Sequence, residues 1–149
     1  MWGQLSNPTY SWQWVNQGVY SDATKSIALD PAKQLAKGSR YYSVMTVRNT
    51  SNQTWNKGEV RLAVVKQDSS KGWISTDGNF YDSTWAAKNR IVTFNETSVA
   101  PGATATFEYW IKTPTTNGFY KDYVNLVNDS VSWFSNNQGV NMWGQLSEF

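Results

Sequence analysis

Residues 103–112 read Ala-Thr-Ala-Thr-Phe-Glu-Tyr-Trp-Ile-Lys, and this stretch decides the class of fold. Apolar side chains recur at every second position up to Ile111, and mostly polar ones occupy the positions between them. Successive side chains of a β-strand point to opposite faces, so the alternation predicts a strand with one face in a core and the other toward solvent. Trp110 falls on the solvent side with Glu108 and Lys112, where an apolar ring is unexpected.

The same period of two recurs along most of the chain. It appears around Val60–Val64 and Tyr120–Leu126, and we expect further strands at residues 10–17, 41–48, 90–95, 131–134 and 140–146. Helical periodicity is limited to one or two turns near residues 31–36. Turn signals separate the segments, for example Pro101-Gly102 before the strand that begins at residue 103. The pattern predicts an all-β fold, an immunoglobulin-like antiparallel β-sandwich of about seven to nine strands.

The hexapeptide Met-Trp-Gly-Gln-Leu-Ser occurs twice, at residues 1–6 and 142–147. The simplest interpretation is one period of a tandem array, in which residues 1–6 end a preceding repeat, residues 7–147 form the sandwich and residues 148–149 are a tail. A tag-like or engineered duplication is the alternative. In an array, Asn7-Pro8-Thr9 would leave almost no linker, so adjacent repeats of the same chain are expected contacts.

Composition excludes several classes of function. The chain has no cysteine and no histidine, which removes disulfides, thiolate or imidazole metal sites and Ser-His or Cys-His catalysis. The net charge is only +2 and the basic residues are scattered, so nucleic acid is not an expected partner. No apolar run is long enough for membrane insertion. We expect a domain that is not an enzyme and that uses no cofactor and no metal.

A resemblance to a known family follows from three short motifs. They are residues 49–55 (NTSNQTW), Val99-Ala100-Pro101-Gly102 leading into residues 107–110 (FEYW), and residues 118–120 (GFY) followed by residues 125–127 (NLV). Their order and spacing resemble the four-tryptophan (FW) immunoglobulin-like family, the central domain of an autophagy cargo receptor. The family is widespread in bacterial exported proteins, where it is often appended to cell-wall or polysaccharide hydrolases. The resemblance covers about residues 41–143, and Val124, where animal members have a tryptophan, favours a bacterial-type member.

By position, the resemblance aligns four tryptophans with those of the family: Trp55, Trp85, Trp133 and Trp143. We expect these rings to be structural, closing the sandwich and donating their indole N–H groups to acceptors. Trp85 would hold down the long segment 67–90, which has no clear period and is therefore a candidate functional loop.

Four other aromatic residues are candidate ligand-binding residues: Trp110, Trp73, Tyr81 and Tyr123. An exposed ring offers a flat surface on which a sugar can stack, with neighbouring polar groups as hydrogen-bond partners. The competing interpretation is that a loop covers Trp110 and that Trp73 only packs its own loop. Oxygen ligands in Asp77-Gly78-Asn79 and Asp82 lie close together in sequence, but they lack the order of a calcium-binding loop, and a solvated turn is the simpler interpretation.

These observations predict a non-catalytic repeat module of an extracellular or cell-surface protein that binds polysaccharide or cell-wall glycan through exposed aromatic rings. An export signal, if the parent protein has one, would lie outside this fragment. The alternative is a structural spacer or protein-contacting repeat in which the tryptophans are core or inter-repeat contacts. A glycosidase would need two paired carboxylates in a cleft, and the sequence indicates no such pair.

Overall fold

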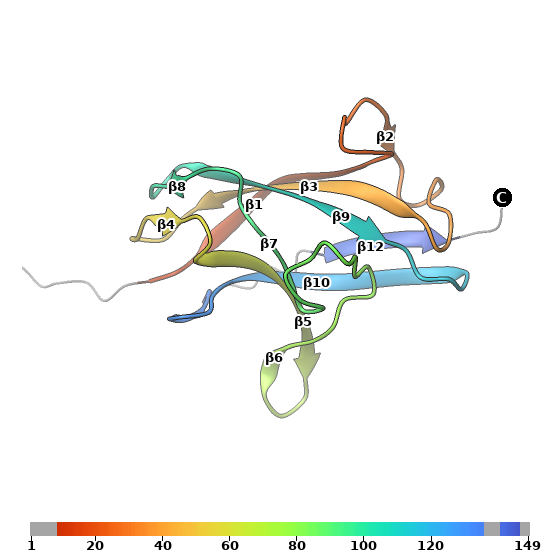
Figure 1. Ribbon diagram of the computed structural model, residues 1–149. Helices are drawn as coiled ribbons and strands as arrows, with labels where there is room; N and C mark the ends of the chain where they lie inside the picture. The colour runs from red at the N-terminus through yellow and green to blue at the C-terminus, as the bar shows by residue number, and fades with distance from the viewer. Residues whose placement is uncertain (1–8, 136–140, 147–149) are drawn as a thin grey trace, which may run out of the picture.

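The computed structural model describes residues 9–135 and, in the last strand, the backbone of residues 141–146 with Gly144 (Figure 1). These residues form an all-β fold without a helix. The strands are β1 (Trp12–Tyr20), β2 (Ala28–Leu29), β3 (Arg40–Asn49), β4 (Trp55–Asn56), β5 (Val60–Asp68), β6 (Gly72–Ser75), β7 (Arg90–Thr93), β8 (Ser98–Val99), β9 (Thr104–Lys112), β10 (Gly118–Asn128), β11 (Ser132–Trp133) and β12 (Asn141–Leu146). The described part of the chain contains no helix long and apolar enough to cross a membrane.

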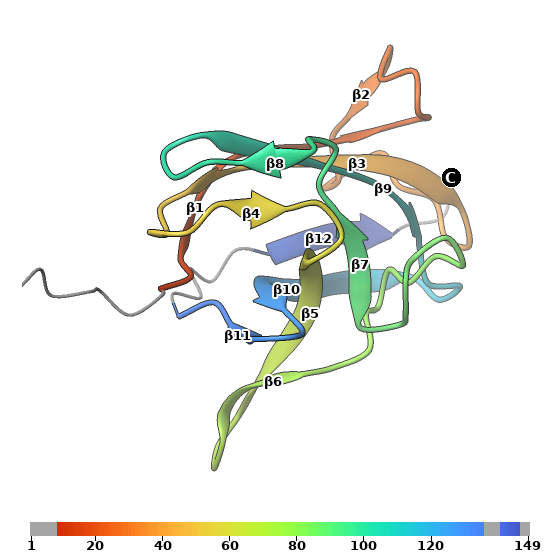
Figure 2. The same cartoon turned by 60° about the vertical axis from the view of Figure 1, so that its left-hand side comes forward.

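Two antiparallel sheets lie one above the other (Figure 1). Sheet A has the order β2-β1-β3-β9. In sheet B the central strands β10 and β5 pair with each other; β11 and β12 pair with the free side of β10, and β6 and β7 with the free side of β5. The short strands β4 and β8 form a third pair, which Figure 2 shows at the side of the two layers.

The core lies between the sheets and confirms the predicted alternation. Ala105, Phe107, Tyr109 and Ile111 of β9 are all at most 5% exposed, whereas Thr104 and Lys112 are exposed. The inward residues of the other long strands are also buried, namely Met45, Val47, Val60, Leu62, Val64, Val124 and Leu126. Burying this apolar surface is the main favourable term in folding, so the period of two both selects the strands and holds the sheets together.

The strand count exceeds the predicted seven to nine. Eight strands have four residues or more, and four pairs of residues form two-residue strands. These short strands follow turns, where two residues can form backbone hydrogen bonds without a repeated side-chain pattern. Sequence periodicity cannot detect a strand of two residues.

The prediction of one irregular segment over residues 67–90 was partly wrong, because β6 forms a hairpin with β5. The Asp68 carboxylate accepts hydrogen bonds from the N–H groups of Ser70 and Lys71 and from the Ser70 hydroxyl, and Gly72 adopts φ 76°. An aspartate that caps the turn, followed by glycine at positive φ, closes the hairpin. The region near residues 31–36 is a hydrogen-bonded turn, with Lys33 and Gln34 donating to the Asp30 carbonyl.

Candidate functional site

Two of the four candidate binding residues lie together on the outer face of sheet B. Trp73 of β6 and Tyr123 of β10 contact each other edge to face, with ring centroids 5.3 Å apart. Their strands are separated by β5, where Val65 is the register partner of both Tyr123 and Ser75. Residues opposite each other in a ladder share a face, so the hairpin that brings β6 back along β5 places Trp73 beside Tyr123.

A second aromatic group on the same face is centred on Trp133. Trp133 pairs with Val127, which is four residues beyond Tyr123 on β10, so both rings lie on one side of the sheet. The Arg90 guanidinium lies 4.9 Å from the centroid of the Trp133 ring and forms an ion pair with Asp129 at 3.0 Å. Trp133 nevertheless remains 38% exposed.

Lys121 completes this surface, with its Nζ 4.6 Å from the centroid of the Tyr123 ring. We call the set Trp73, Tyr123, Lys121, Arg90 and Trp133 the sheet B strip. Ala63, Val65 and Val127 form its floor and are nearly fully buried. Small side chains in the floor and large rings above them produce an aromatic surface with cations over two of its rings.

Trp110 lies in the other layer, on the outer face of sheet A. The Arg40 guanidinium stacks 4.3 Å from the centroid of its ring, and Tyr42 contacts it edge to face at 5.2 Å. Arg40 is held by Asp82 through two hydrogen bonds of 2.7 and 3.1 Å, and the Asp82 side chain is only 2% exposed. The ring is thus outward-facing, as predicted, but an anchored cation covers it.

A turn adds to the cover of this face. Lys25, in the turn between β1 and β2, forms a 2.9 Å ion pair with Glu108 of β9, at the opposite edge of sheet A. Lys25 has φ 59°, a conformation that is uncommon for a residue with a side chain. The hydrogen bond from Lys25 lowers the pKa of Glu108 the most, and the hydrogen bond from Asn95 lowers it by less. The ion pair therefore crosses the strands between the two edges, over the outer face of sheet A.

Tyr81 does not join either surface. It packs edge to face against Trp85, with ring centroids 5.8 Å apart, in the segment between β6 and β7. Trp85 is 5% exposed, and its indole N–H donates to the Trp110 carbonyl at 2.6 Å, so it anchors this segment to β9 as predicted. Tyr81 is part of that anchor.

The predicted structural tryptophans have three different outcomes. Trp55 is buried and donates its indole N–H to the Ser51 hydroxyl, and Trp85 is buried as described above. The prediction for Trp133 was wrong: Phe134, at 3% exposure, occupies the core and packs against Trp55. In a two-residue strand the alternation is too short to distinguish the inward residue from its neighbour. Trp143 takes the register position opposite Lys121, and its side chain lies outside the described residues.

Asn125 is a buried polar residue that links the two sheets, and the sequence pattern did not indicate this role. Strand alternation places it outward with Tyr123, but it is 4% exposed and accepts a hydrogen bond from the Trp12 indole at 2.9 Å. It also donates to the Phe134 carbonyl. A buried amide that joins both sheets needs partners from two distant segments, which no local pattern shows.

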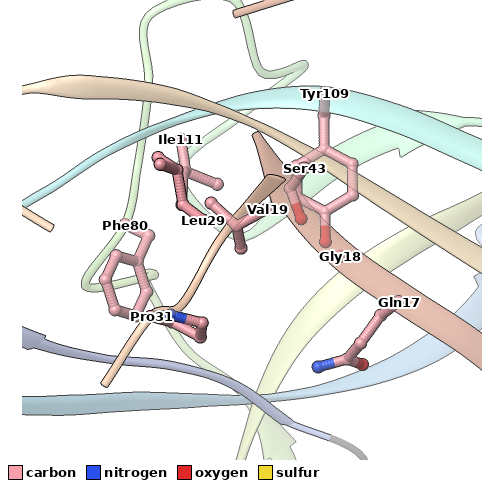
Figure 3. A pocket seen from close by; sticks show the side chains of 9 residues that line it. All are labelled: Gln17, Gly18, Val19, Leu29, Pro31, Ser43, Phe80, Tyr109 and Ile111. Carbon is pink, nitrogen blue, oxygen red and sulfur yellow. The ribbon is translucent and has the colours of Figure 1, made fainter. Parts of the chain in front are cut away.

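A partly open pocket of about 260 Å³ is lined by residues of both the surface and the core. Figure 3 shows Ser43 and Tyr109 next to each other on one side, and Phe80 with Pro31 on another; Gln17, Gly18, Val19, Leu29 and Ile111 complete the lining. Burial raises the pKa of the Tyr109 hydroxyl far above its usual range. The described residues of the lining include no carboxylate and no ammonium group.

The two buried carboxylates of the described chain have structural partners. Hydrogen bonds from Arg40 and Thr84 lower the pKa of Asp82 to about 2. The Asp82 carboxylate forms an ion pair with Arg40. Burial raises the pKa of Asp122, which accepts hydrogen bonds from the backbone N–H groups of Asn79 and Phe80 and from the Asn79 amide. Among the described residues no group of three His, Cys, Asp or Glu side chains is arranged to hold a metal ion. Asp82 thus pairs with Arg40, and Asp122 accepts hydrogen bonds from the turn at Asn79 and Phe80.

Comparison with known proteins adds no family assignment, since no protein-family model and no curated protein matches the chain.

Proposed function

We propose that this domain is a non-catalytic polysaccharide-binding module and that the sheet B strip is its binding surface. The observation that carries the proposal is the grouping of Trp73, Tyr123 and Trp133 on one sheet face, with Lys121 over the Tyr123 ring and Arg90 over the Trp133 ring. Trp73 and Tyr123 were candidate residues from the sequence, and the fold places them in contact although 50 residues separate them.

An extended face suits a polymer better than it suits a small molecule. Tyr123 and Trp133 are offset by four residues along the strand direction, or about 13 Å at the rise of a β-strand. Several consecutive sugar rings of one glycan chain could span that offset and contact both groups of rings. Small ligands are usually enclosed in a concave pocket of limited length.

The charges on the strip indicate the polar part of the ligand. Arg61, Arg90 and Lys121 lie on this face by register, and Asp129 is the acid paired with Arg90. Cationic side chains donate hydrogen bonds to hydroxyl and, more strongly, to carboxylate oxygens. An acidic glycan is therefore the preferred ligand class.

The wider identity of the domain is proposed on the same basis. Two facing antiparallel sheets with a shared core support an immunoglobulin-like sandwich of the bacterial four-tryptophan type. The repeated hexapeptide supports a tandem module, and a polar, cysteine-free, aromatic-rich composition supports an extracellular or cell-surface location. A structural spacer is the alternative, and buried Trp12, Trp55 and Trp85 are the tryptophans that favour it.

The proposal is tested by retention on insoluble cell-wall material and on neutral and acidic polysaccharides. Trp73→Ala is the test variant and Trp110→Ala is the matched control, because both remove a partly exposed tryptophan from an outer sheet face. Circular dichroism and thermal unfolding verify that each variant folds. We expect the wild type and Trp110→Ala to be retained and Trp73→Ala to lose retention by about tenfold or more, which corresponds to the loss of a central aromatic contact.

Equal retention of the Trp73→Ala variant would remove the strip from the proposal. No retention of the wild type on any matrix would favour the structural spacer.

A further inference from the structure

We infer that the side of β10 that pairs with β12 is a receptor site for the sequence Met-Trp-Gly-Gln-Leu-Ser. Residues 1–6 of a second copy of the chain would bind there in place of β12. The site is the edge of β10 from Gly118 to Tyr123, with Leu35 and Phe80 behind it. The proposal concerns assembly of the chain and is independent of glycan binding.

Identity of sequence is the first argument. β12 pairs antiparallel with β10 from Gly118 opposite Leu146 to Tyr123 opposite Asn141, and five of its six residues belong to the second copy of the hexapeptide. Residues 1–5 have the same five side chains in the same order. They can therefore form the same backbone hydrogen bonds and fill the same space as β12.

Gly144 makes the site selective. This residue is buried, and a Cβ atom placed on it would lie 2.6 Å from Cδ1 of Leu35 and 3.7 Å from the Phe80 ring. Leu35 is fully buried, so its methyl group has little room to move. A side chain at this position requires Leu35 to shift, and the N-terminal copy has Gly3 there.

The segment from Leu5 to Tyr10 is short for residues 1–6 to occupy the site of their own molecule in the same orientation as β12. Leu5 would lie opposite Gly118, whereas Tyr10 lies near Leu126, because Ser135 N–H donates to the Tyr10 carbonyl and Phe134 N–H donates to the Leu126 carbonyl. Eight residues of β10 span about 26 Å. The five residues from Leu5 to Tyr10 extend at most about 18 Å. The first copy therefore reaches the site of another molecule more readily than its own.

The resulting contact is head-to-tail. β1 starts at the end of the molecule opposite the end where β12 finishes (Figure 1). A donor chain therefore leaves the receptor at the Gly118 end, and its own receptor site remains available to a third chain. Such a heterologous contact forms open chains rather than a closed dimer. In the wild type the tethered β12 competes at an effective concentration on the order of millimolar, so exchange needs a weakened β12.

The test uses the full chain with Gly144→Glu, which places a carboxylate and added bulk against Leu35 and expels β12. Analytical ultracentrifugation over a wide range of protein concentration measures the mass. We expect the wild type and Gly3→Glu to sediment as one chain of 16.9 kDa, Gly144→Glu to form a concentration-dependent series of oligomers, and the double variant Gly3→Glu/Gly144→Glu to lose that series.

Synthetic Met-Trp-Gly-Gln-Leu-Ser peptide provides a second measurement if Gly144→Glu or the double variant unfolds. The peptide should restore folding or raise the melting temperature of the double variant, and a peptide with glutamate in place of glycine should not. The inference is overturned if Gly144→Glu is folded and monomeric at every concentration, if the double variant forms the same oligomers, or if an unfolded variant does not respond to the peptide.

Discussion

The outer faces of the two sheets both present tryptophan under a cation, but the cations are anchored differently. On sheet A, Arg40 covers Trp110 and is fixed by Asp82, whose side chain is 2% exposed. On sheet B, Arg90 lies over Trp133 and its ion-pair partner Asp129 is 45% exposed, although Arg90 itself is 19% exposed and also donates to the Ser75 hydroxyl and the Asn89 carbonyl. A buried ion-pair partner keeps its cation in place, whereas a solvated pair is weak and exchanges with water. The two faces thus differ in the burial of the carboxylate that pairs with the cation, which is 2% exposed on sheet A and 45% exposed on sheet B.

The largest effect on this comparison is expected from Asp82→Ala. The substitution removes the acceptor of hydrogen bonds from Arg40 and from the Thr84 backbone and hydroxyl. We expect a loss of about 2–3 kcal/mol in the free energy of unfolding, as for charged groups with several hydrogen bonds. Urea denaturation measures it, and a loss below about 0.5 kcal/mol would show that Arg40 is not anchored.

The same anchor predicts a dependence on acid. The pKa of Asp82 is lowered from 3.8 to about 2 in the folded protein, so its contribution is fully present above pH 3.8 and is lost as the pH falls through about 2. Solvent around the half-exposed Arg40 limits the contribution to about 1–2 kcal/mol. The stability difference between the wild type and Asp82→Asn should shrink across this range. A constant difference from pH 5 to pH 2 would contradict the assignment.

Trp133→Ala should have a smaller effect on stability and a selective effect on binding. The ring is 38% exposed, so we expect a stability loss of about 1 kcal/mol, compared with about 3–5 kcal/mol for Trp55→Ala in the core. Retention on the glycan that binds the wild type should fall by about tenfold. Thermal unfolding and retention assays on the same preparation separate the two effects, and a variant that unfolds like Trp55→Ala would place Trp133 in the core.

The smallest effect is expected from Asp129→Asn. It breaks the ion pair of Arg90 on sheet B and should cost at most about 0.5 kcal/mol, because the carboxylate is solvated. Urea denaturation of Asp129→Asn and Asp82→Asn under identical conditions compares the unfolding free energies that the two ion pairs contribute. Equal losses for the two variants would remove the distinction between the faces.

Local alternation predicted the layers of this fold but not the covering of its surfaces. The inward set of β9 and the pair Met45 and Val47 follow from a period of two within one strand. The contact of Arg40 with Trp110 needs a neighbouring strand at a particular register, and Asp82 comes from a segment 42 residues away. Such contacts depend on tertiary structure that a single strand does not encode.

The candidate site shows the same division. Trp73 and Tyr123 were identified singly as outward or unassigned rings, and only the β5–β6 hairpin places them together. Trp133 was expected to be structural from its alignment with a family tryptophan, but the adjacent Phe134 is the buried residue, and a shift of one residue exchanges the two faces of a strand. The turn made by Asp68 and Gly72 was the available signal for the hairpin.

The most direct test of the sheet B strip is nuclear magnetic resonance of the tryptophan indole N–H groups during titration with an oligosaccharide of the glycan that retains the protein. Single Trp→Phe variants assign each signal. We predict that the signals of Trp73 and Trp133 shift progressively with ligand, while those of Trp110 and of buried Trp85 stay in place. Shifts confined to Trp110 and its neighbours would contradict the account and place the binding surface on sheet A.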